Sequence, residues 1–358
     1  MAFADALRLP ESLASVERAA LGSAYRAQQA AIRAPLLASH LLLRVLGRGR
    51  RGSPPPVAAL TALRREYEAL LERDLANVRE GLYPRSLLFQ IPWSDYARSL
   101  PRFVADLPRV VWRSRRGDFK DVPDTGSRRF PGYFRRTYHW QTDGYLSRHS
   151  ARVYDLSVEV LFLGCADVMR RQVIPPMARF AEAQRQAARP LRILDVGCGT
   201  GHTLGQIATA LPGQQYFGVD LSPWYLEEAR RRLAHVPDLS LLCDSAEQLP
   251  FRDDYFDVVT SVYLLHEMPR RVRRRVVAEL ARVLRPGGLL VLEDSAQLAE
   301  ARDLAPFLRA FTEMMHEPYY RDYMGDDLEG LLAEAGLEVG GTERAWLSKV
   351  VSARAPGA

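Results

Sequence analysis

The feature that most constrains this chain is a strand followed at once by a glycine-rich turn and a helix. Residues 193–196 read as a buried strand, residues 197–201 (Gly-Cys-Gly-Thr-Gly) as the turn, and His202 begins a helical pattern. Glycines let the backbone approach a ligand closely, and a helix N-terminus offers unpaired N–H groups to an anion. The dinucleotide pattern Gly-x-Gly-x-x-Gly/Ala does not fit, because its last position falls on His202 or Leu204. The motif therefore predicts a ligand-binding turn of another kind.

From Leu191 onward, short β-branched runs alternate with longer helical patterns. We expect strands at 191–196, 216–220, 239–244, 256–262 and 288–293, with helices near 202–211, 223–235 and 270–284. Repeated strand–helix–strand units require a mostly parallel sheet with helices on both faces. A helical stretch at 326–335 precedes two last strands, 337–344 and 346–353, whose short link permits only an antiparallel hairpin. The fold class is therefore α/β.

The N-terminal half is predicted to be mainly helical. Residues 1–46 carry apolar positions at helical spacing, and the Gly-, Arg- and Pro-rich stretch 47–56 then breaks regular structure. We expect further helices over 57–80, around 99–116 and over 150–187. The predicted organisation is a helical arm with a linker (1–56), a mainly helical region (57–190) and an α/β domain (191–358).

The two halves carry opposite charge. Residues 1–190 contain 31 Lys/Arg against 18 Asp/Glu, whereas residues 191–358 contain 18 against 25. A basic half is one way to anchor a nucleic acid. However, its arginines are mixed with acidic residues and proline-rich turns, and residues 261–264 (Ser-Val-Tyr-Leu) differ from the Asn/Asp-Pro-Pro-aromatic run used on base amino groups. A nucleic-acid partner is therefore the weaker interpretation.

Compartment and membrane signals are few. The cysteines Cys165, Cys198 and Cys243 have no metal-ligand spacing and cannot form a disulfide scaffold. The chain has neither a signal-peptide pattern nor the roughly 18 consecutive apolar residues of a membrane span. We expect a cytoplasmic protein without a metal site. Residues 36–51, apolar and then arginine-rich, either lie peripherally on an anionic membrane or pack on the chain itself or on a second subunit. The sequence does not indicate an oligomeric state.

Acidic residues follow the second and third predicted strands. Asp220 ends the run Gly-Val-Asp-Leu-Ser, and Asp244 ends the run Leu-Cys-Asp-Ser-Ala. In doubly wound folds an acid at the first of these positions takes the ribose hydroxyls of a nucleotide-like ligand. The second acid stands where an adenine amino group would lie.

Taken together, these motifs over residues 191–353 resemble the class I S-adenosylmethionine-dependent methyltransferases, in particular the small-molecule branch that includes the ubiquinone and menaquinone C-methyltransferases. The resemblance implies a Rossmann-like seven-stranded sheet of order 3-2-1-4-5-7-6 with strand 7 antiparallel, and S-adenosyl-L-methionine as cofactor. Residues 138–147 (YHWQTDGYLS) also resemble a stretch in poorly characterised bacterial, cyanobacterial and plastid methyltransferases, which implies no activity. By resemblance, the cofactor-binding residues are Asp195, Gly197, Gly199, Gly201, Asp220, Leu221, Asp244, Ser245, Ala246 and Ser261.

Methyl transfer from a sulfonium depends mainly on alignment, and it needs a base only where the nucleophile must lose a proton. The candidate catalytic residues are His266, His316 and His139. The candidate substrate or lid residues are Tyr138, Tyr145, Glu293, Tyr319 and Tyr320. Structural roles stay open for them, namely helix capping near His266 and Glu293 and an interdomain aromatic seam around Tyr138.

The expected function is methylation of a small hydrophobic or aromatic metabolite. Two alternatives remain at this point: a methyltransferase for RNA or another macromolecule that uses the basic half, and a membrane-associated lipid or quinone methyltransferase. The acceptor and the atom that is methylated cannot be read from these motifs.

Overall fold

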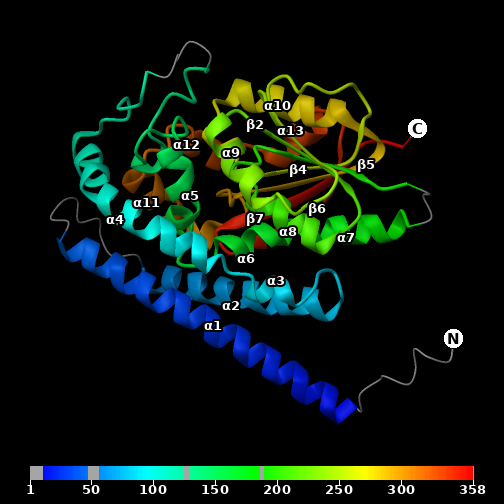
Figure 1. Cartoon of the computed structure of the whole chain (residues 1–358), viewed down its shortest axis with the longest axis horizontal. Coiled ribbons are helices and arrows are strands. Elements are labelled where there is room, and N and C mark those ends of the chain that lie inside the picture. Colours follow the sequence, from blue (N-terminus) through cyan, green and yellow to red (C-terminus); the bar gives the residue numbers. More distant parts are fainter. Residues whose placement is uncertain (1–10, 47–55, 125–129, 186–188, 358) are drawn as a thin grey trace.

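The computed structural model describes residues 11–46, 56–124, 130–185 and 189–357 (Figure 1). The expected linker at 47–56 falls almost entirely outside these ranges. Seven strands form one sheet in the order β3-β2-β1-β4-β5-β7-β6, as expected. The strands are β1 (Arg192–Val196), β2 (Gln215–Asp220), β3 (Leu239–Cys243), β4 (Phe256–Val262), β5 (Leu284–Ser295), β6 (Glu338–Ala345) and β7 (Ser348–Arg354).

The sheet is parallel from β3 through β5, and β7 runs antiparallel to both of its neighbours. Helices connect β1 to β2, β2 to β3 and β4 to β5, because consecutive parallel strands need a crossover connection, and a loop joins β3 to β4. The carboxyl ends of β1, β2, β3 and β4 therefore meet along one edge. The helices of this part are α8 (His202–Ala210), α9 (Pro223–Arg232), α10 (Arg270–Val283) and α13 (Leu328–Glu334).

The helices of the N-terminal half pack on the sheet rather than standing apart. They are α1 (Glu11–Leu46), α2 (Val57–Arg79), α3 (Ser86–Phe89), α4 (Trp93–Arg116), α5 (Arg148–Leu161), α6 (Ala166–Arg170) and α7 (Ile174–Ala183). One hydrophobic cluster joins Tyr25 of α1 and Leu75 of α2 to Ile193 of β1 and Trp346 of the last hairpin. A second cluster fills the other face, where α10 and α13 lie (Figure 1).

The single helix expected over 150–187 is wrong, because the structure divides it into α5, α6 and α7 with a short 3₁₀ turn at Arg171–Val173. The break after α5 has a clear cause. Leu163 and Gly164 both adopt positive φ, at 52° and 81°, which no helix can continue through. A Cβ on Gly164 would lie 2.5 Å from Ile32 of α1, so the glycine also allows α1 to approach. Tertiary packing thus overrides the local helical pattern.

The insertion between β5 and the last hairpin carries α11 (Ala305–Met314) and α12 (Tyr320–Met324). Two 3₁₀ turns face this insertion, η2 (Tyr138–Trp140) and η4 (Leu265–Glu267). The backbone N–H of His139 in η2 donates to the carbonyl of His316, which follows α11, at 3.3 Å. Segments from three distant parts of the sequence therefore lie side by side.

Candidate functional site

The glycine turn after β1 has the backbone that its sequence predicts. Gly197, Gly199 and Gly201 all adopt positive φ, at 76°, 55° and 78°. A Cβ on Gly201 would lie 2.8 Å from a methyl of Leu233, so both conformation and space require glycine there. The turn leads directly into the N-terminus of α8.

Asp220 joins the ends of the first strands. Its carboxylate accepts hydrogen bonds from the backbone N–H groups of Gly199 and Ser222, each at 2.8 Å. Its carbonyl accepts from the N–H of Asp244 at 3.2 Å, and Asp244 itself is exposed. Burial raises the pKa of Asp220 to about 6, although both backbone donors favour the ionised form. Leu221, which follows Asp220, is half-buried at the same edge.

Asp195 is the buried acid of this edge. Only 1% of the residue is exposed, and neither carboxylate oxygen has a hydrogen-bond partner among the described residues. Burial, with the nearby Asp220, raises its pKa to about 7. Because an unpaired buried carboxylate is costly, its oxygens suit a ligand that brings a cation or hydrogen-bond donors. The methionine ammonium group of S-adenosyl-L-methionine is such a donor, so these residues fit the cofactor.

Other predicted cofactor residues complete the same edge. The Ser261 hydroxyl donates to the carbonyl of Val196 at 2.7 Å and is buried beneath the turn. Ser245 and Ala246 are half-buried just after Asp244. The predicted set therefore converges at the carboxyl ends of β1 to β4.

Residues 130–147, which we call the lid segment, cross this edge. The Tyr133 hydroxyl donates to the carboxylate of Glu247 at 2.7 Å, beyond β3. The Ser222 hydroxyl, beyond β2, donates to the carbonyl of Tyr145 at 2.6 Å. The Tyr138 hydroxyl donates to the carbonyl of Glu267, beyond β4, at 2.9 Å, and the rings of Tyr138 and Tyr145 stack at 5.5 Å. The segment is thus tied to the ends of three strands.

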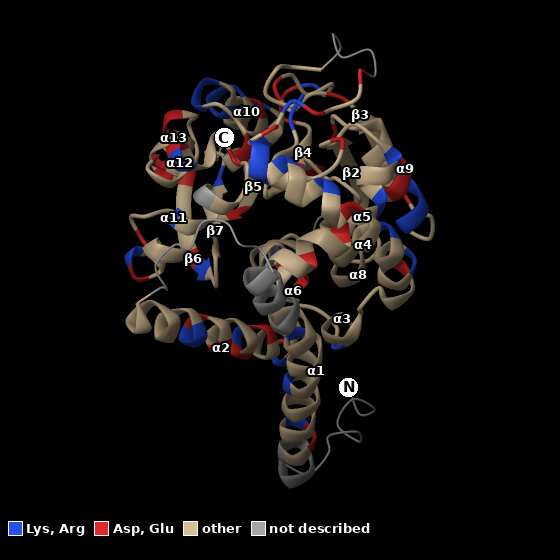
Figure 2. Cartoon of the chain, turned by 90° about the vertical axis from the view of Figure 1, so that its left-hand side faces the viewer, with Lys and Arg blue, Asp and Glu red and all other residues tan. Residues whose placement is uncertain are grey.

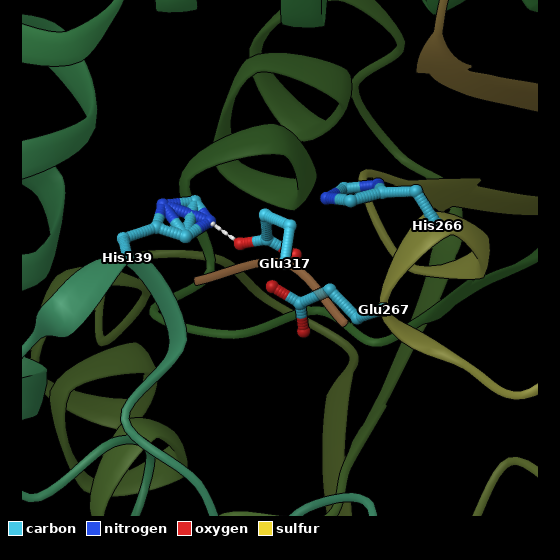
Figure 3. A group of neighbouring side chains, drawn as sticks. All are labelled: His139, His266, Glu267 and Glu317. Carbon is cyan, nitrogen blue, oxygen red and sulfur yellow. Dashed lines mark ion pairs between the residues drawn. The ribbon is translucent and has the colours of Figure 1, made fainter. Parts of the chain in front are cut away.

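Four titratable side chains meet beneath the lid segment (Figure 3). They are His139 of the lid segment, His266 and Glu267 of η4, and Glu317 of the insertion. One ligand atom from each lies within 4.8 Å of all the others. The His139 Nε2 lies 2.5 Å from Glu317 Oε1, and the Glu317 side chain is fully buried. We call this group the His–Glu cluster.

Burial and neighbouring charges shift the pKa values in this cluster. Burial lowers the pKa of His139 to about 3 and raises that of Glu267 to about 7. It also raises the pKa of Glu317 well above its usual range, with Glu267 adding to the effect. For His266 burial acts downward, but the carboxylate of Asp294 outweighs it and the pKa rises to about 9. The site therefore holds one imidazole whose pKa is lowered and one whose pKa is raised, beside two carboxyl groups whose raised pKa values disfavour ionisation.

Asp294 supports the cluster from behind. Its Oδ1 lies 2.6 Å from His266 Nδ1, and its Oδ2 accepts from the backbone N–H of Leu265 at 2.8 Å. Asp294 therefore caps the η4 turn and orients the imidazole. Capping was one of the interpretations that the sequence left open for this position.

The other candidate residues lie around the cluster or away from it. Tyr320 is buried, with its ring in edge contact with His266 at 5.8 Å and its hydroxyl bonded to Ser295. His316 stacks on Phe119 at 4.6 Å, and burial lowers its pKa to about 4. Its ring is thus not among the four grouped side chains.

Tyr319 lies 5.8 Å below the guanidinium of Arg136. Glu293 of β5 is fully buried and accepts from the hydroxyls of Tyr263 at 3.2 Å and Ser348 at 2.7 Å. It therefore links the residue after β4 to the first residue of β7. The candidate site residues did not include Glu267, Glu317 or Asp294. Glu267 and Glu317 each adjoin a candidate histidine in the sequence, and Asp294 follows Glu293, but no spacing rule connects the three segments that the structure brings together.

Comparison with known proteins adds the chemical context. Residues 193–288 match a family model described as a methyltransferase domain. The chain is 38% identical to phthiotriol/phenolphthiotriol dimycocerosates methyltransferase 1 of Mycobacterium ulcerans, over 30% of this chain and 40% of that protein. It is 38% identical to the ubiquinone/menaquinone biosynthesis C-methyltransferase UbiE of Burkholderia orbicola, over 36% and 54% respectively.

A third relative is the O-methyltransferase resE of Aspergillus sclerotiorum, 33% identical over 46% of this chain and 61% of that protein. The chain thus spans about half the length of the curated relatives it matches. Residues 139 and 317 of the His–Glu cluster lie outside the range of the family model. The similarity therefore describes the sheet and its glycine turn.

Proposed function

We propose that this chain, which contains a class I S-adenosylmethionine-dependent methyltransferase domain, transfers a methyl group to a small hydrophobic or aromatic metabolite. One observation carries the proposal. The unpaired carboxylate of Asp195, the three positive-φ glycines and Asp220 meet at one sheet edge under the lid segment. By their names, one relative is a methyltransferase of phthiotriol and phenolphthiotriol dimycocerosates, and another is a C-methyltransferase of ubiquinone and menaquinone biosynthesis.

S-adenosyl-L-methionine supplies, when bound, a methyl group on a positively charged sulfur that is already activated for displacement. In this proposal Asp195 and the glycine turn hold the methionine end, and Asp220 accepts from the ribose hydroxyls. Leu221 and Asp244 border the adenine. Alignment of nucleophile, methyl and sulfur can contribute roughly 7–11 kcal/mol, so positioning is the main task of these residues.

The lid aromatics have two proposed tasks. The stacked rings of Tyr138 and Tyr145 exclude water from the reacting atoms, and aromatic faces favour a cation beside them. The His–Glu cluster below them is the proposed acceptor side. A phenol, enol or acidic carbon must lose a proton, and His139, His266 and Glu317 are the groups placed to assist.

A macromolecular acceptor is the less favoured alternative. Along α2, basic and acidic residues are interspersed rather than segregated (Figure 2). Arginines of the basic half are paired locally, as Arg171 is with Asp74 at 2.5 Å and Arg170 with Asp167 at 2.9 Å. Such pairing leaves less free charge for phosphate groups.

A membrane-associated reaction has one specific observation in its favour. Helix α4 exposes an apolar stripe at helical spacing, with Trp93 60%, Leu100 51%, Val104 53% and Trp112 45% exposed. Arg115, one turn further along, is also exposed, as on helices that lie on anionic lipid. No helix in the described ranges is long and apolar enough to cross a bilayer. We therefore propose α4, together with residues 36–51, as the peripheral membrane contact. Within residues 36–51 the structure describes side chains only up to residue 37.

The membrane contact is tested by co-sedimentation of the full chain with phosphatidylglycerol vesicles. Replacing Trp112 and Leu100 by Ser should lower the bound fraction, whereas deletion of residues 36–51 tests the other segment separately. Equal binding by all three proteins, or none by the parent chain, would exclude both surfaces.

The methyl-transfer proposal is tested in two steps. Calorimetry should first detect binding of S-adenosylhomocysteine by the purified chain, and a folded chain without binding would refute the proposal. Metabolites of cells with and without the gene, fed with methyl-labelled methionine, should then differ by a labelled small molecule. Labelled RNA instead would favour the macromolecular alternative.

A further inference from the structure

We propose that His139, His266, Glu267 and Glu317 bind one divalent transition-metal ion, with Zn²⁺, Mn²⁺ or Fe²⁺ as the suitable ions. Nothing in the sequence motifs or in the matched methyltransferase model indicates such a site. Two of the four ligands come from the lid segment and the insertion, outside that model.

The first argument is geometric. Three segments distant in sequence bring four ligand atoms within 4.8 Å of one another. Four ligands about 2.0–2.2 Å from a single ion lie about 3.3–3.6 Å apart in a tetrahedron, so side-chain shifts of about an ångström would close the shell. Figure 3 shows His139, Glu317 and Glu267 turned toward one another and a ring nitrogen of His266 facing them.

The second argument is the absence of hydrogen-bond partners. Both oxygens of Glu317 and the Nε2 of His139 are buried and lack hydrogen-bond partners among the described residues, although Nε2 and Oε1 lie 2.5 Å apart. The carboxyl group of Glu267 is a second acidic group at the same point. Ionising two carboxyl groups in a buried site that has only imidazoles as basic neighbours is costly. A dication would offset the two negative charges and accept the free lone pairs.

The third argument is the support behind each ligand. Metal-bound histidines usually donate their other ring N–H to a carboxylate, which leaves the facing nitrogen free for the ion. Asp294 occupies this position at 2.6 Å from His266 Nδ1. Likewise the Tyr145 hydroxyl donates to Glu267 Oε1, which orients that carboxylate and leaves Oε2 for the ion.

The donor set selects the class of ion. Imidazole nitrogens combined with carboxylates suit Zn²⁺, Mn²⁺ and Fe²⁺, whereas Mg²⁺ and Ca²⁺ prefer oxygen ligands alone. His139 adopts positive φ, at 53°, which is uncommon for a side-chain-bearing residue and fits a position held for its imidazole.

The role of the ion rests on the proposed function. The hydroxyl of Tyr145 contacts Glu267 of the cluster, and its backbone carbonyl accepts from Ser222 just after β2. The proposed acceptor and cofactor sites therefore adjoin at Tyr145. With an ion in the cluster, the four side chains would act as ligands rather than as bases. The ion would bind an acceptor hydroxyl and lower its pKa, so that the proton leaves to water. The oxygen then forms its bond to the methyl carbon as the carbon–sulfur bond breaks and its electron pair returns to sulfur.

The experiment measures metal binding directly and does not require turnover. The full chain is stripped with a chelator, dialysed against Zn²⁺, Mn²⁺, Co²⁺ or Mg²⁺ in turn, and analysed for metal content. We expect one transition-metal ion per chain, with little Mg²⁺, and Co²⁺ should produce visible absorption bands. Mg²⁺ binding without transition-metal binding would overturn the proposal.

Variants assign the ligands. E317Q and H139Q should weaken binding at least tenfold, and D294N, which removes only the carboxylate behind His266, should weaken it by about 10–100-fold. H235Q is the matched control, because His235 is exposed on a distant helix end and should leave binding unchanged. Circular dichroism and binding of S-adenosylhomocysteine show that each variant is folded.

Two outcomes would overturn the metal site. One is a folded chain that retains no transition metal after dialysis, which would mean that the four groups share protons instead. The other is metal binding that E317Q and H139Q do not alter. Failure of S-adenosylhomocysteine binding with metal binding intact would refute the proposed function and leave the metal site standing.

Discussion

The replacement Asp220→Asn tests the cofactor site most directly. The Asp220 carboxylate already accepts two backbone N–H groups, from Gly199 and Ser222, at 2.8 Å each. In our proposal it also accepts from the ribose hydroxyls. An amide keeps the size of the side chain but has only one oxygen that can accept. Its NH₂ group is a donor and would lie against one of the N–H or O–H donors that the carboxylate accepts from.

The magnitude follows from these contacts. Hydrogen bonds to a charged acceptor contribute about 1.5–3 kcal/mol each. The backbone contacts exist with and without ligand, so the change in affinity comes from the ribose. Asp220→Asn loses one charged ribose contact and weakens the other, and we expect a loss of about 3 kcal/mol of binding free energy. That corresponds to a rise in Kd of about 100-fold.

The assay is calorimetric titration of the variant with S-adenosylhomocysteine, after thermal unfolding has shown that it is folded. Asp253→Asn is the matched control, because Asp253 is an exposed acid at the start of β4, at the opposite edge of the sheet. A Kd for Asp220→Asn within about threefold of the parent value would refute the ribose assignment, given the expected loss of charged contacts.

Three further predictions concern pH, the turn and the buried core. The pKa of Asp195 is raised to about 7, so its carboxyl is protonated below that pH. Binding of S-adenosylhomocysteine should therefore weaken as pH falls from 8 to 5.5, by up to about thirtyfold, and calorimetry that finds no change would contradict this role. Gly201→Ala places a Cβ 2.8 Å from Leu233 at a φ of 78°, so binding should fall at least tenfold, roughly 1.4 kcal/mol, and undiminished affinity would contradict the required turn. Asp74→Ala leaves the buried guanidinium of Arg171 without its carboxylate and should lower the unfolding free energy by about 3–5 kcal/mol in urea titrations, whereas a loss under about 1 kcal/mol would show that the pair is dispensable.

The sheet was predictable because its signals are local. Each β-branched run is followed by a turn and a helical pattern, and the order of these units leaves few topologies open. The hairpin was predicted from the short link between residues 337–344 and 346–353, and in the structure β6 and β7 are joined by Trp346 and Leu347. The cofactor edge was predictable for the same reason, since its glycines and acids stand at strand ends.

The helical half was less predictable. Its apolar pattern continues through residues 162–165, and only the approach of α1 to Gly164 explains why the chain turns there. Helix α4 begins at Trp93, earlier than the predicted helix around 99–116, and it continues through Pro101 and Pro108. Helix ends in this half depend on packing partners that are distant in sequence.

The sequence by itself determined the α/β class, the mostly parallel sheet and the edge at which Asp195, the glycine turn and Asp220 lie, because periodicity and strand-end motifs are properties of neighbouring residues. The strand order was implied by the resemblance to the methyltransferases, and the structure has the same order. Only the tertiary structure decided that His139, His266, Glu267 and Glu317 form one buried group. These residues come from a lid, a strand-end turn and an insertion, and their meeting depends on how three segments pack. The spacing of residues along the chain does not predict such a grouping, because contacts between distant segments depend on the surfaces that they bury together.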